Sequence, residues 1–555
     1  MHKTFSSWWK TGAPWIWLNA AAVAASLSMV VGLLLLIAIN GLGHFWPKAV
    51  WEIEYREPDG QTQRLIGEIV DTEKISHERM QAAGKNLAGT DKEFIERYLL
   101  KTGNRDVSGL DFRWISQPSI IERSKPERLV VFERVEWGNF YGFLDSVSEN
   151  GEQVAKGGTA WEVLQTRLDR VDAIRSQIRH LEKSDIGTIN YNIEQLRLEQ
   201  RKLELEGRDT PAALAEIEQQ RSTLQAKFVD LRKALDAKYA EISRDSVAMT
   251  VMDGRSITVP LDNIVRAYQP NGMSLPGKIA FYIAKLWEFV SADPREANTE
   301  GGIFPAIFGT VMMVLLMSVI VTPFGVVAAV YLREYAKQGP VTRLIRIAVN
   351  NLAGVPSIVY GVFGLGFFVY FLGGNIDQLF FPEALPAPTF GTPGLMWASL
   401  TLALLTLPVV IVATEEGLAR IPSSIREGSL ALGATKAETL WRTVLPMSTP
   451  AMMTGLILAV ARAAGEVAPL MLVGVVKLAP ALPLDTNSPF LHLDRKFMHL
   501  GFHIYDVGFQ SPNVEAARPL VYATALLLVA IIIILNLAAI AIRNRLRERY
   551  RELEQ

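Results

Sequence analysis

An arginine and a glutamate lie four residues apart inside a long apolar stretch of the sequence. The stretch is ILAVARAAGEVAP, residues 457–469, and the two charges are Arg462 and Glu466. A charge inside a membrane segment is costly unless it faces protein or water. Residues i and i+4 share one face of a helix, and a guanidinium fork can bind a tetrahedral oxyanion through two hydrogen bonds. The pair is therefore interpreted either as part of an anion path or as a structural ion pair that joins two helices.

Apolar segments long enough to cross a bilayer, about 20 residues each, surround this pair and recur along the chain. They lie near 16–39, 305–332, 347–372, 395–414, 450–476 and 519–542. The first remains apolar from Leu18 to Ile39, which is too long for a typical signal-peptide core. Tryptophans, which favour the membrane interface, cluster at its start: Trp8, Trp9, Trp15 and Trp17. We expect an α-helical polytopic membrane protein with about six transmembrane helices, the first an uncut anchor.

Basic residues gather at the termini and in the loops after the second and fourth spans. They are Lys3, Lys10, Arg333, Lys337, Arg343, Arg346, Arg420, Arg426, Lys436, Arg442, Arg543, Arg545, Arg547, Arg549 and Arg551. Lys and Arg in short loops favour the cytoplasmic side. The pattern predicts an inner-membrane protein with both termini cytoplasmic. Residues 1–44 would hold the N-terminus and first helix, about 40–300 would be periplasmic, and 546–555 would form a cytoplasmic tail.

The long segment between the first two spans, residues 45–295, predicts an external α+β domain. Residues 50–57, 129–137 and 247–261 are rich in aromatic and β-branched residues, as strands are. Turn signals at Pro58-Asp59-Gly60 and Asp253-Gly254 accompany them.

Residues at about 160–243 are helical in pattern. Apolar residues recur there at the spacing of a coiled-coil seam: Ile189, Ile193, Leu196, Leu203, Leu224, Phe228, Leu231 and Leu235. Gly207 to Pro211 breaks the helix, Thr210 suits an N-cap, and Ser184-Asp185 is expected to interrupt the first arm. This predicts an antiparallel coiled-coil hairpin with a packing role.

Composition excludes several kinds of chemistry. Among 555 residues there is no cysteine, so disulfides, thiolate metal sites and cysteine nucleophiles are excluded. The seven histidines lack metal-site spacing, and a net charge of -1 gives no bulk basic character for nucleic acid. GMSLPGK, residues 272–278, has the spacing of a phosphate-binding loop, but Ile279 replaces the Ser/Thr ligand of magnesium. We also expect no helix to follow a buried strand there. The chain is thus predicted not to be an enzyme and to bind no cofactor directly.

Residues 416–446 resemble the EAA loop of permease subunits in binding-protein-dependent ABC importers. The family pattern is E-A-A, three residues, Gly, nine residues and I-x-L-P. Here Glu427-Gly428-Ser429, Gly433 and Thr443-Val444-Leu445-Pro446 stand at those spacings. Ser423 or Ser424 is expected to cap a short helix, and Gly433 to permit a left-handed turn. The resemblance implies coupling to a separate ATPase chain through Glu427, Gly428, Gly433, Ala434, Leu445 and Pro446.

Other segments resemble the PstA family of phosphate ABC importer permeases. They are NTEGGIFPAIFGT (298–310), TPFGVVAAVYLREY (322–335), NNLAGVPSIVYGVFGLGFFV (350–369), ARAAGEVAPL (461–470) and HIYDVGFQSP (503–512). The resemblance covers about 295–545 together with the first span. It implies a permease core with five transmembrane helices at 296–545, while residues 45–290 are an unusually large insertion.

The resemblance also implies a function and partners. Phosphate would pass Arg462 and Glu466, and the carboxylate could accept a hydrogen bond from HPO4²⁻ that sulfate cannot offer. The implied partners are a PstC-like second permease, PstB-like ATPases that use ATP and magnesium, and a PstS-like external phosphate-binding protein. Family members can carry an arginine where Ala413 stands here, which puts that position's contribution in doubt. Glu415 and Glu416 are expected at the cytoplasmic interface.

Two other functions remain open on the sequence. The coiled coil after the first span is also typical of ABC-type proteins that transmit motion to an external enzyme. Alternatively, the permease imports another oxyanion, such as molybdate or sulfate. A predicted helix break at Gly354-Val355-Pro356-Ser357 could turn free amides toward an anion or could be a packing kink.

Overall fold

The structure is a computed structural model that describes residues 11–57, 59–76, 93–479, 481–511 and 514–551. It forms two compact units. The membrane unit comprises Met1–Phe45, Ile303–Phe381 and Leu385–Gln555, and the extramembrane unit comprises Trp46–Gly302 with Pro382–Ala384. Several residues used in the sequence predictions lie outside the described residues: Lys3, Trp8, Trp9, Lys10 and Pro58.

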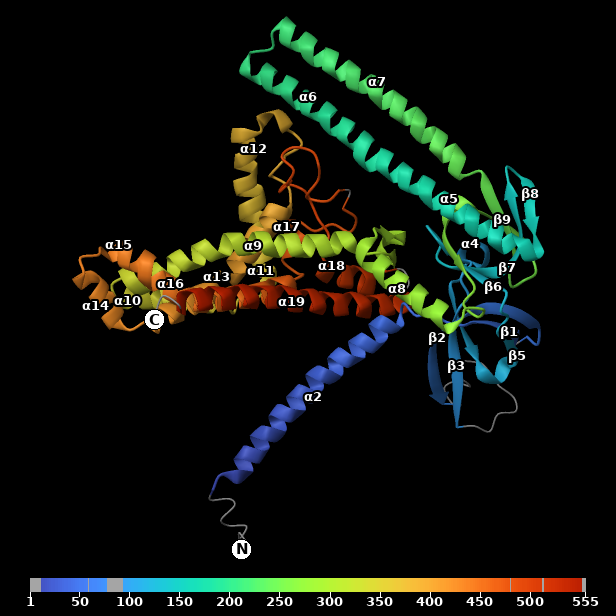
Figure 1. Ribbon diagram of the computed structural model, residues 1–555, viewed down its shortest axis with the longest axis horizontal. Helices are drawn as coiled ribbons and strands as arrows, with labels where there is room; N and C mark the ends of the chain where they lie inside the picture. The colour runs from blue at the N-terminus through green and yellow to red at the C-terminus, as the bar shows by residue number, and fades with distance from the viewer. Residues whose placement is uncertain (1–10, 58, 77–92, 480, 512–513, 552–555) are drawn as a thin grey trace. The chain divides into compact units, whose positions relative to one another are not determined.

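Six helices among the described residues are long and apolar enough to cross a membrane, in agreement with the predicted number (Figure 1). These helices are Ala13–Gly43, Phe304–Tyr335, Ser357–Phe380, Leu395–Ala419, Lys436–Ala464 and Ala517–Leu546. Their main labelled segments are α2 (Ala13–Gly43), α9 (Phe304–Val330), α11 (Ser357–Phe363), α12 (Gly374–Phe380), α13 (Leu395–Ala419), α16 (Leu445–Ala464) and α19 (Val514–Arg551).

Two spans have bounds that differ from the predicted ones by ten residues or more. The third begins at Ser357 rather than at residue 347, because α10 (Pro340–Leu352) is a separate helix. Pro356 has no amide hydrogen and disfavours the helical conformation at the residue before it, which favours a break between α10 and α11 at this point. The fifth span runs from Lys436 to Ala464 rather than from residue 450 to residue 476.

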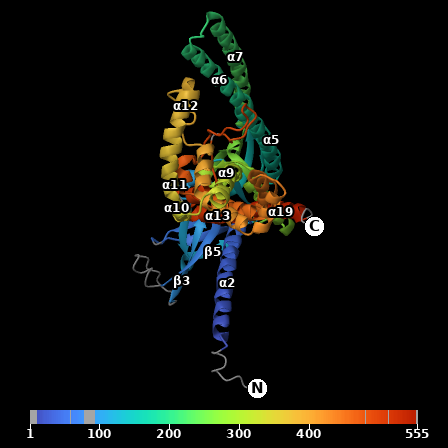
Figure 2. The ribbon, with the colours of Figure 1, turned by 90° about the vertical axis from the view of Figure 1, so that its left-hand side faces the viewer.

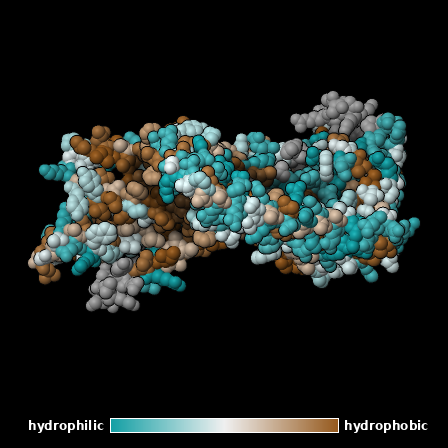
Figure 3. All heavy atoms as spheres, turned by 90° about the horizontal axis from the view of Figure 1, so that it is seen from above, coloured by the Kyte–Doolittle hydropathy of each residue, from teal (hydrophilic) through white to brown (hydrophobic). Residues whose placement is uncertain are grey.

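Helix α13 forms the centre of the membrane unit, with α9 and α16 packed against it. Glycines bring these helices close together. A Cβ on Gly325 would lie 2.5 Å from Val410, and one on Gly455 would lie 2.6 Å from Ala413. Small residues of this kind allow the tight van der Waals contact that holds membrane helices together. In Figure 3, hydrophobic residues gather over the membrane unit, whereas hydrophilic residues dominate the surface of the extramembrane unit.

Two antiparallel sheets form the body of the extramembrane unit. One has the order β4-β3-β2-β1-β5, and the other has the order β10-β9-β7-β6-β11 with β8 beside β7. Their bounds are β1 (Val50–Arg56), β2 (Thr62–Ser76), β3 (Phe94–Lys101), β4 (Phe112–Ser116), β5 (Ile120–Ser124), β6 (Leu129–Arg134), β7 (Phe140–Glu149), β8 (Glu152–Lys156), β9 (Asp245–Thr250), β10 (Ser256–Pro260) and β11 (Ile264–Tyr268). The predicted strand at 247–261 is in fact the β9–β10 hairpin, which turns at Gly254 with φ +82°.

A helical hairpin is inserted between β8 and β9. It consists of α5 (Ala160–His180), α6 (Gly187–Glu206) and α7 (Pro211–Ile242), and α6 and α7 run side by side in both ribbon views (Figures 1 and 2). A π-helical turn, Leu181–Ile186, joins α5 to α6 where an interruption is predicted. The Thr210 hydroxyl caps α7 by accepting the Ala213 amide hydrogen. The supercoil of a coiled coil stays a prediction.

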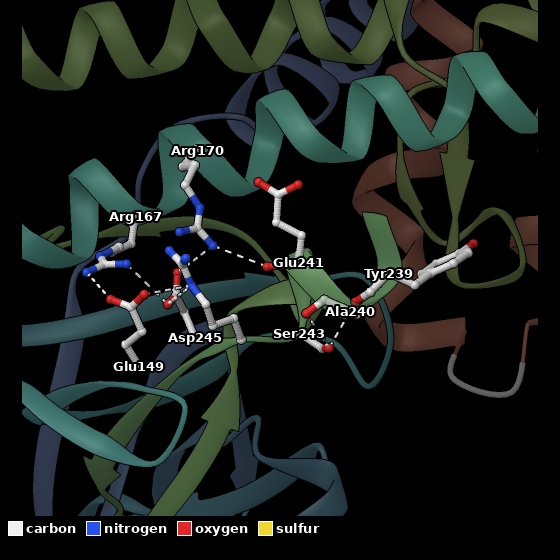
Figure 4. Close-up of polar contacts among 9 residues, drawn as sticks. Glu149, Arg167, Arg170, Tyr239, Ala240, Glu241, Ser243 and Asp245 are labelled. Atoms are coloured by element: carbon white, nitrogen blue, oxygen red, sulfur yellow. Dashed lines mark hydrogen bonds and ion pairs between the residues drawn. The ribbon is translucent and has the colours of Figure 1, made fainter. Parts of the chain in front are cut away.

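Ion pairs fix this hairpin to the sheet at its root (Figure 4). Asp245 begins β9 and is almost fully buried, and Arg167 and Arg170 of α5 approach its carboxylate at 3.3 and 3.2 Å. Arg167 also pairs with Glu149 of β7 at 2.6 Å. A buried carboxylate is tolerated only with such partners. The cluster therefore sets the direction in which the hairpin leaves the sheet.

Helix α8 (Leu275–Ser291) follows strand β11, which corrects the expectation that no helix follows a strand near residues 272–278. The Ser274 hydroxyl accepts the Gly277 amide hydrogen at 3.4 Å and caps the helix. Strand β11 lies at the edge of an antiparallel sheet, and Gly277 and Lys278 lie inside the helix rather than in a loop before it.

Candidate functional site

The fifth span ends between the two charges that the sequence singles out. Arg462 lies in the last turn of α16, and Glu466 lies beyond its end, in an irregular segment before α17 (Leu470–Val473). The two residues therefore do not share one uninterrupted helix, which corrects that expectation. Amide hydrogens of Gly465 and Glu466 bond to the carbonyls of Arg462 and Ala463, both at 3.2 Å, and tighten the final turn.

Close packing from two neighbouring segments holds this break. A Cβ on Gly361 of α11 would lie 2.6 Å from the Cα of Pro469. A Cβ on Gly501 of α18 (Leu500–Tyr505) would lie 2.8 Å from Val467. Because only a hydrogen atom fits at both glycines, the irregular segment is confined on two sides.

His499 supports the second of these contacts by capping α18. Its Nδ1 accepts the amide hydrogens of Gly501 and Phe502 at 3.1 and 3.4 Å. An imidazole can accept at Nδ1 only when that nitrogen carries no proton. Burial lowers the pKa of His499 to about 3, so the ring is neutral at physiological pH.

The contact between Arg462 and Glu466 is loose. Arg462 Nε lies 3.6 Å from Glu466 Oε1, and the side chains are 33% and 18% exposed. This is the one polar contact of the Arg462 side chain among the residues that the structure describes. The guanidinium has five N–H donors, so most of them have no protein acceptor among the described residues. A cation at the end of a helix is also favoured by the helix dipole. The site can bind an anion beside a carboxylate.

The predicted coupling loop folds as two short helices joined by a turn. Helix α14 (Ser423–Ala431) follows Pro422 and has no side-chain cap, so the expected capping by Ser423 or Ser424 is wrong. Both serines lie in the first turn of the helix. Gly433 has φ +88°, the predicted left-handed conformation. Helix α15 (Lys436–Thr439) follows the turn.

A capping box starts α15. The Thr435 hydroxyl accepts the Glu438 amide hydrogen at 3.2 Å, and the Glu438 carboxylate accepts the Thr435 amide hydrogen at 2.9 Å. The Thr435 hydrogen bonds lower the pKa of Glu438. This cap was not predicted from the sequence, although Thr-x-x-Glu before a helix is a recognisable signal.

Arg426 anchors α14 to the end of the second span. Its Nη2 lies 2.8 Å from Glu334 Oε1, in the π-helical turn Tyr331–Tyr335 that continues α9. The same guanidinium donates to the carbonyls of Ile421 and Leu418 at 2.7 and 2.8 Å. Lys436 lies over the Tyr335 ring at 4.5 Å. Motion of the loop is thereby tied to the second span.

The loop exposes apolar side chains that sequence reasoning missed. Leu432 is 91% exposed and Trp441 is 74% exposed. Glu427 and Gly428 are exposed on α14 beside them. Of the other predicted coupling residues, Ala434 is half-buried after the turn, and Leu445 and Pro446 are half-buried at the start of α16. Leu432 precedes the fifth span and is free to contact a partner chain, whereas Trp441 lies near the start of that span, where tryptophan also suits the membrane interface.

A pocket of about 240 Å³ with both charged and apolar lining residues lies at the end of α13. Glu415 and Glu416 line it together with Arg333 and Arg346. Arg346 pairs with Glu415 at 2.6 Å. The two glutamates thus lie at the end of the fourth span, which leads into the coupling loop, whereas Arg462 lies at the end of the fifth span.

Comparison with known proteins gives a consistent result. Residues 321–552 match the family described as binding-protein-dependent transport system inner membrane component. The phosphate transport system permease protein PstA 1 of Mycobacterium tuberculosis is 34% identical over 244 residues, 44% of this chain and 70% of that protein. PstA of Yersinia pestis is 31% identical over 45% of this chain and 75% of that protein. An inward-facing structure of the MetNI methionine ABC transporter covers 49% of this chain and 99% of that chain at 18% identity, with a TM-score of only 0.31.

The six spans and these sequence relatives define the class, a multi-pass membrane subunit of an ABC transport system. The chain belongs to the family of binding-protein-dependent transport system inner membrane components, and its PstA relatives are phosphate permeases. The family match leaves Trp46–Gly302 uncovered, in agreement with a large insertion after the first span.

Proposed function

We propose that this chain is the permease subunit of an ATP-driven importer of inorganic phosphate. It forms half of a translocation path with a PstC-like subunit and receives phosphate from a PstS-like external binding protein. PstB-like chains hydrolyse ATP with magnesium. The observation that carries the proposal is the Arg462 guanidinium, held at a broken membrane helix with most of its donors unused. The identity to PstA permeases supports phosphate as the anion.

In this proposal Arg462 binds the phosphate oxygens and Glu466 accepts a hydrogen bond from the protonated oxygen. Both residues bind phosphate transiently, and no covalent bond changes. The loose 3.6 Å contact suits such a role, because an arriving anion replaces a weak partner rather than a strong one. In this proposal both termini lie in the cytoplasm, which the basic residues of the short loops favour.

The test is radiolabelled phosphate uptake in cells that lack other phosphate importers. Arg462→Ala and Glu466→Gln are compared at matched membrane abundance with the intact chain. Arg343→Ala, which removes an exposed arginine elsewhere in the membrane unit, is the control. We expect uptake to fall at least tenfold in both site variants and to remain in the control, with assembly with the ATPase unchanged. Uptake that survives in both site variants would mean that the pair is structural.

The coupling loop is proposed to dock in a groove on the ATPase subunit. Leu432 and Trp441 are the exposed apolar anchors of that contact. The Arg426–Glu334 pair passes the resulting motion to the second span. An amphipathic helix that places apolar side chains in a groove is a common recognition mode.

The extramembrane unit is proposed to dock or orient the binding protein. Deletion of residues 45–290 with the spans retained should then weaken uptake at low phosphate more than at high phosphate. Unchanged uptake would refute this role.

The helical hairpin favours a second candidate, in which the chain controls an external enzyme through its coiled coil and transports nothing. Import of molybdate or sulfate is a further alternative. Competition of phosphate uptake by these anions, together with the Arg462 variants, separates the candidates. A transmitter would show no uptake of any of the three anions.

A further inference from the structure

Helix α8 of the extramembrane unit exposes one face that carries no charge. Four large apolar side chains at four-residue intervals form this face: Leu275, Ile279, Ile283 and Trp287. Ile283 is 61% exposed and Trp287 is 70% exposed. The remaining exposed residues of the helix are Pro276, Ala280, Ala284 and Ser291. A helix face this apolar on a polar domain is expected to be covered by another protein surface or by lipid.

The opposite face of α8 is fixed to the sheets. Phe289 is buried, and the Phe281 ring packs at a tilt against the ring of Tyr268 of β11, with 4.6 Å between the ring centroids. Lys285 pairs with Glu133 of β6 at 2.8 Å.

A second carboxylate on this face strengthens the attachment. Glu288 pairs with Arg266 and Arg295, each at 3.1 Å. Lys285 and Glu288 of α8 both lie on this packed side. The helix therefore cannot rotate to hide its apolar face without breaking these pairs.

The chain connections keep α8 near a membrane. The Trp46 ring lies 5.8 Å from the Tyr282 ring of α8, and Trp46 follows the end of the first span, Gly43, by only three residues. Because an extended residue covers about 3.5 Å, that stretch spans at most about 11 Å. The second span begins at Phe304, shortly after α8 ends at Ser291.

We propose that α8 lies in the membrane interface, with this apolar face inserted among the lipid headgroups of the leaflet in which the first span ends. An amphipathic helix in this position buries its apolar face to a depth of about 5–10 Å, and tryptophan favours that depth. Because the face has no basic residue, its contact with lipid depends on apolar area and not on lipid charge. The inference holds whichever side of the membrane the unit occupies and whatever the permease transports.

The absence of cysteine allows a direct test in the full chain. Ile283→Cys is labelled with an environment-sensitive fluorophore, and the protein is placed in nanodiscs of neutral phosphatidylcholine with or without doxyl-labelled lipid. Ala284→Cys repeats the measurement at a small residue of the same face. Val154→Cys on β8, also exposed and apolar, is the control in the same unit.

We expect doxyl lipid to quench the labels on α8 at least about twofold more than the control label, and iodide in the water to quench them less. Added anionic lipid should not change the result. Labels that doxyl lipid does not quench overturn the proposal. Quenching by iodide would then mean that the face is in water, and protection from iodide would mean that protein covers it.

Discussion

Two arginine–glutamate pairs of the membrane unit use the same side chains in different ways. Arg426 contacts Glu334 at 2.8 Å and donates to two backbone carbonyls as well, so its guanidinium is engaged on several sides. Arg462 contacts Glu466 at 3.6 Å and has no other polar contact among the described residues. The first pair holds the coupling loop in place. The second leaves an arginine available to a ligand.

The difference shows why residue type alone does not define a site. Both arginines carry the same guanidinium group. The structure separates them by the number of acceptors around each guanidinium. The same substitution should therefore mainly lower stability at Arg426 and mainly lower transport at Arg462.

The largest expected difference is in stability. Arg426→Met should lower the free energy of unfolding by about 3 kcal/mol, because it leaves Glu334 and two carbonyls without their partner. Arg462→Met should cost less than about 1 kcal/mol, because it removes only a loose, part-exposed contact. Denaturant titration of the purified chain in mixed micelles measures both. Equal losses would contradict the distinction between the pairs.

The next expected effect concerns the coupling loop, which Arg426 holds in place. Leu432→Asp should weaken binding to the partner ATPase by about 10- to 100-fold, the value of burying one leucine side chain. Stability should not change, since Leu432 is almost fully exposed. Affinity between the purified subunits is the measurement, and Leu432→Met is the matched control. An unchanged affinity for Leu432→Asp would place the docking surface elsewhere.

A smaller change in stability is expected from the turn between α14 and α15, and a second glycine of α14 provides a control. Gly433→Ala should cost about 1–2 kcal/mol of stability, because φ +88° is strained for a residue with a Cβ. Gly428→Ala, inside α14 with open space around its Cβ, should instead stabilise by up to about 1 kcal/mol. Thermal unfolding compares the two. A loss of similar size in both variants would show that the turn conformation is not the cause.

The smallest effect should come from pH and should affect the Arg462 break rather than the coupling loop. His499 caps α18, which packs against Val467 beside Glu466. Its pKa is about 3 in the fold and near 6.5 when unfolded. The unfolded chain therefore takes up a proton first as pH falls below 6.5, and the fold loses stability from there toward pH 3. The loss between pH 7.5 and 5.5 should be about 1 kcal/mol.

Thermal unfolding at the two pH values tests this prediction. His499→Asn can keep a capping acceptor but cannot titrate, so it should remove this part of the pH dependence. A pH dependence unchanged in this variant would assign the effect to another group.

Much of the fold follows from local patterns in the sequence. Apolar length identified all six spans, and heptad-like spacing identified the helical hairpin. The Thr210-Pro211 cap and the left-handed Gly433 were predictable because each depends on a few neighbouring residues.

The errors arise where distant residues decide the outcome. The sequence remains apolar to residue 476, yet the fifth span ends at Ala464. The segment that follows packs closely against Gly361 and Gly501. The role of Arg426 depends on Glu334, which is 92 residues away. The apolar face of α8 is significant only because its charged face is packed on the sheets. The roles of Arg462, Glu466 and the coupling residues in transport stay predictions.

The attachment of the helical hairpin has a consequence for its far end. Helix α7 contains 32 residues, and a rise of about 1.5 Å per residue makes it about 48 Å long. The hairpin is held at its root by the arginines around Asp245, so it behaves as a lever with its pivot at the sheet. A tilt of about 5° at that pivot would move the tip near Gly207 by about 4 Å. A shift that exchanges one arginine partner at Asp245 would therefore be magnified into a displacement large enough to make or break a contact at the tip.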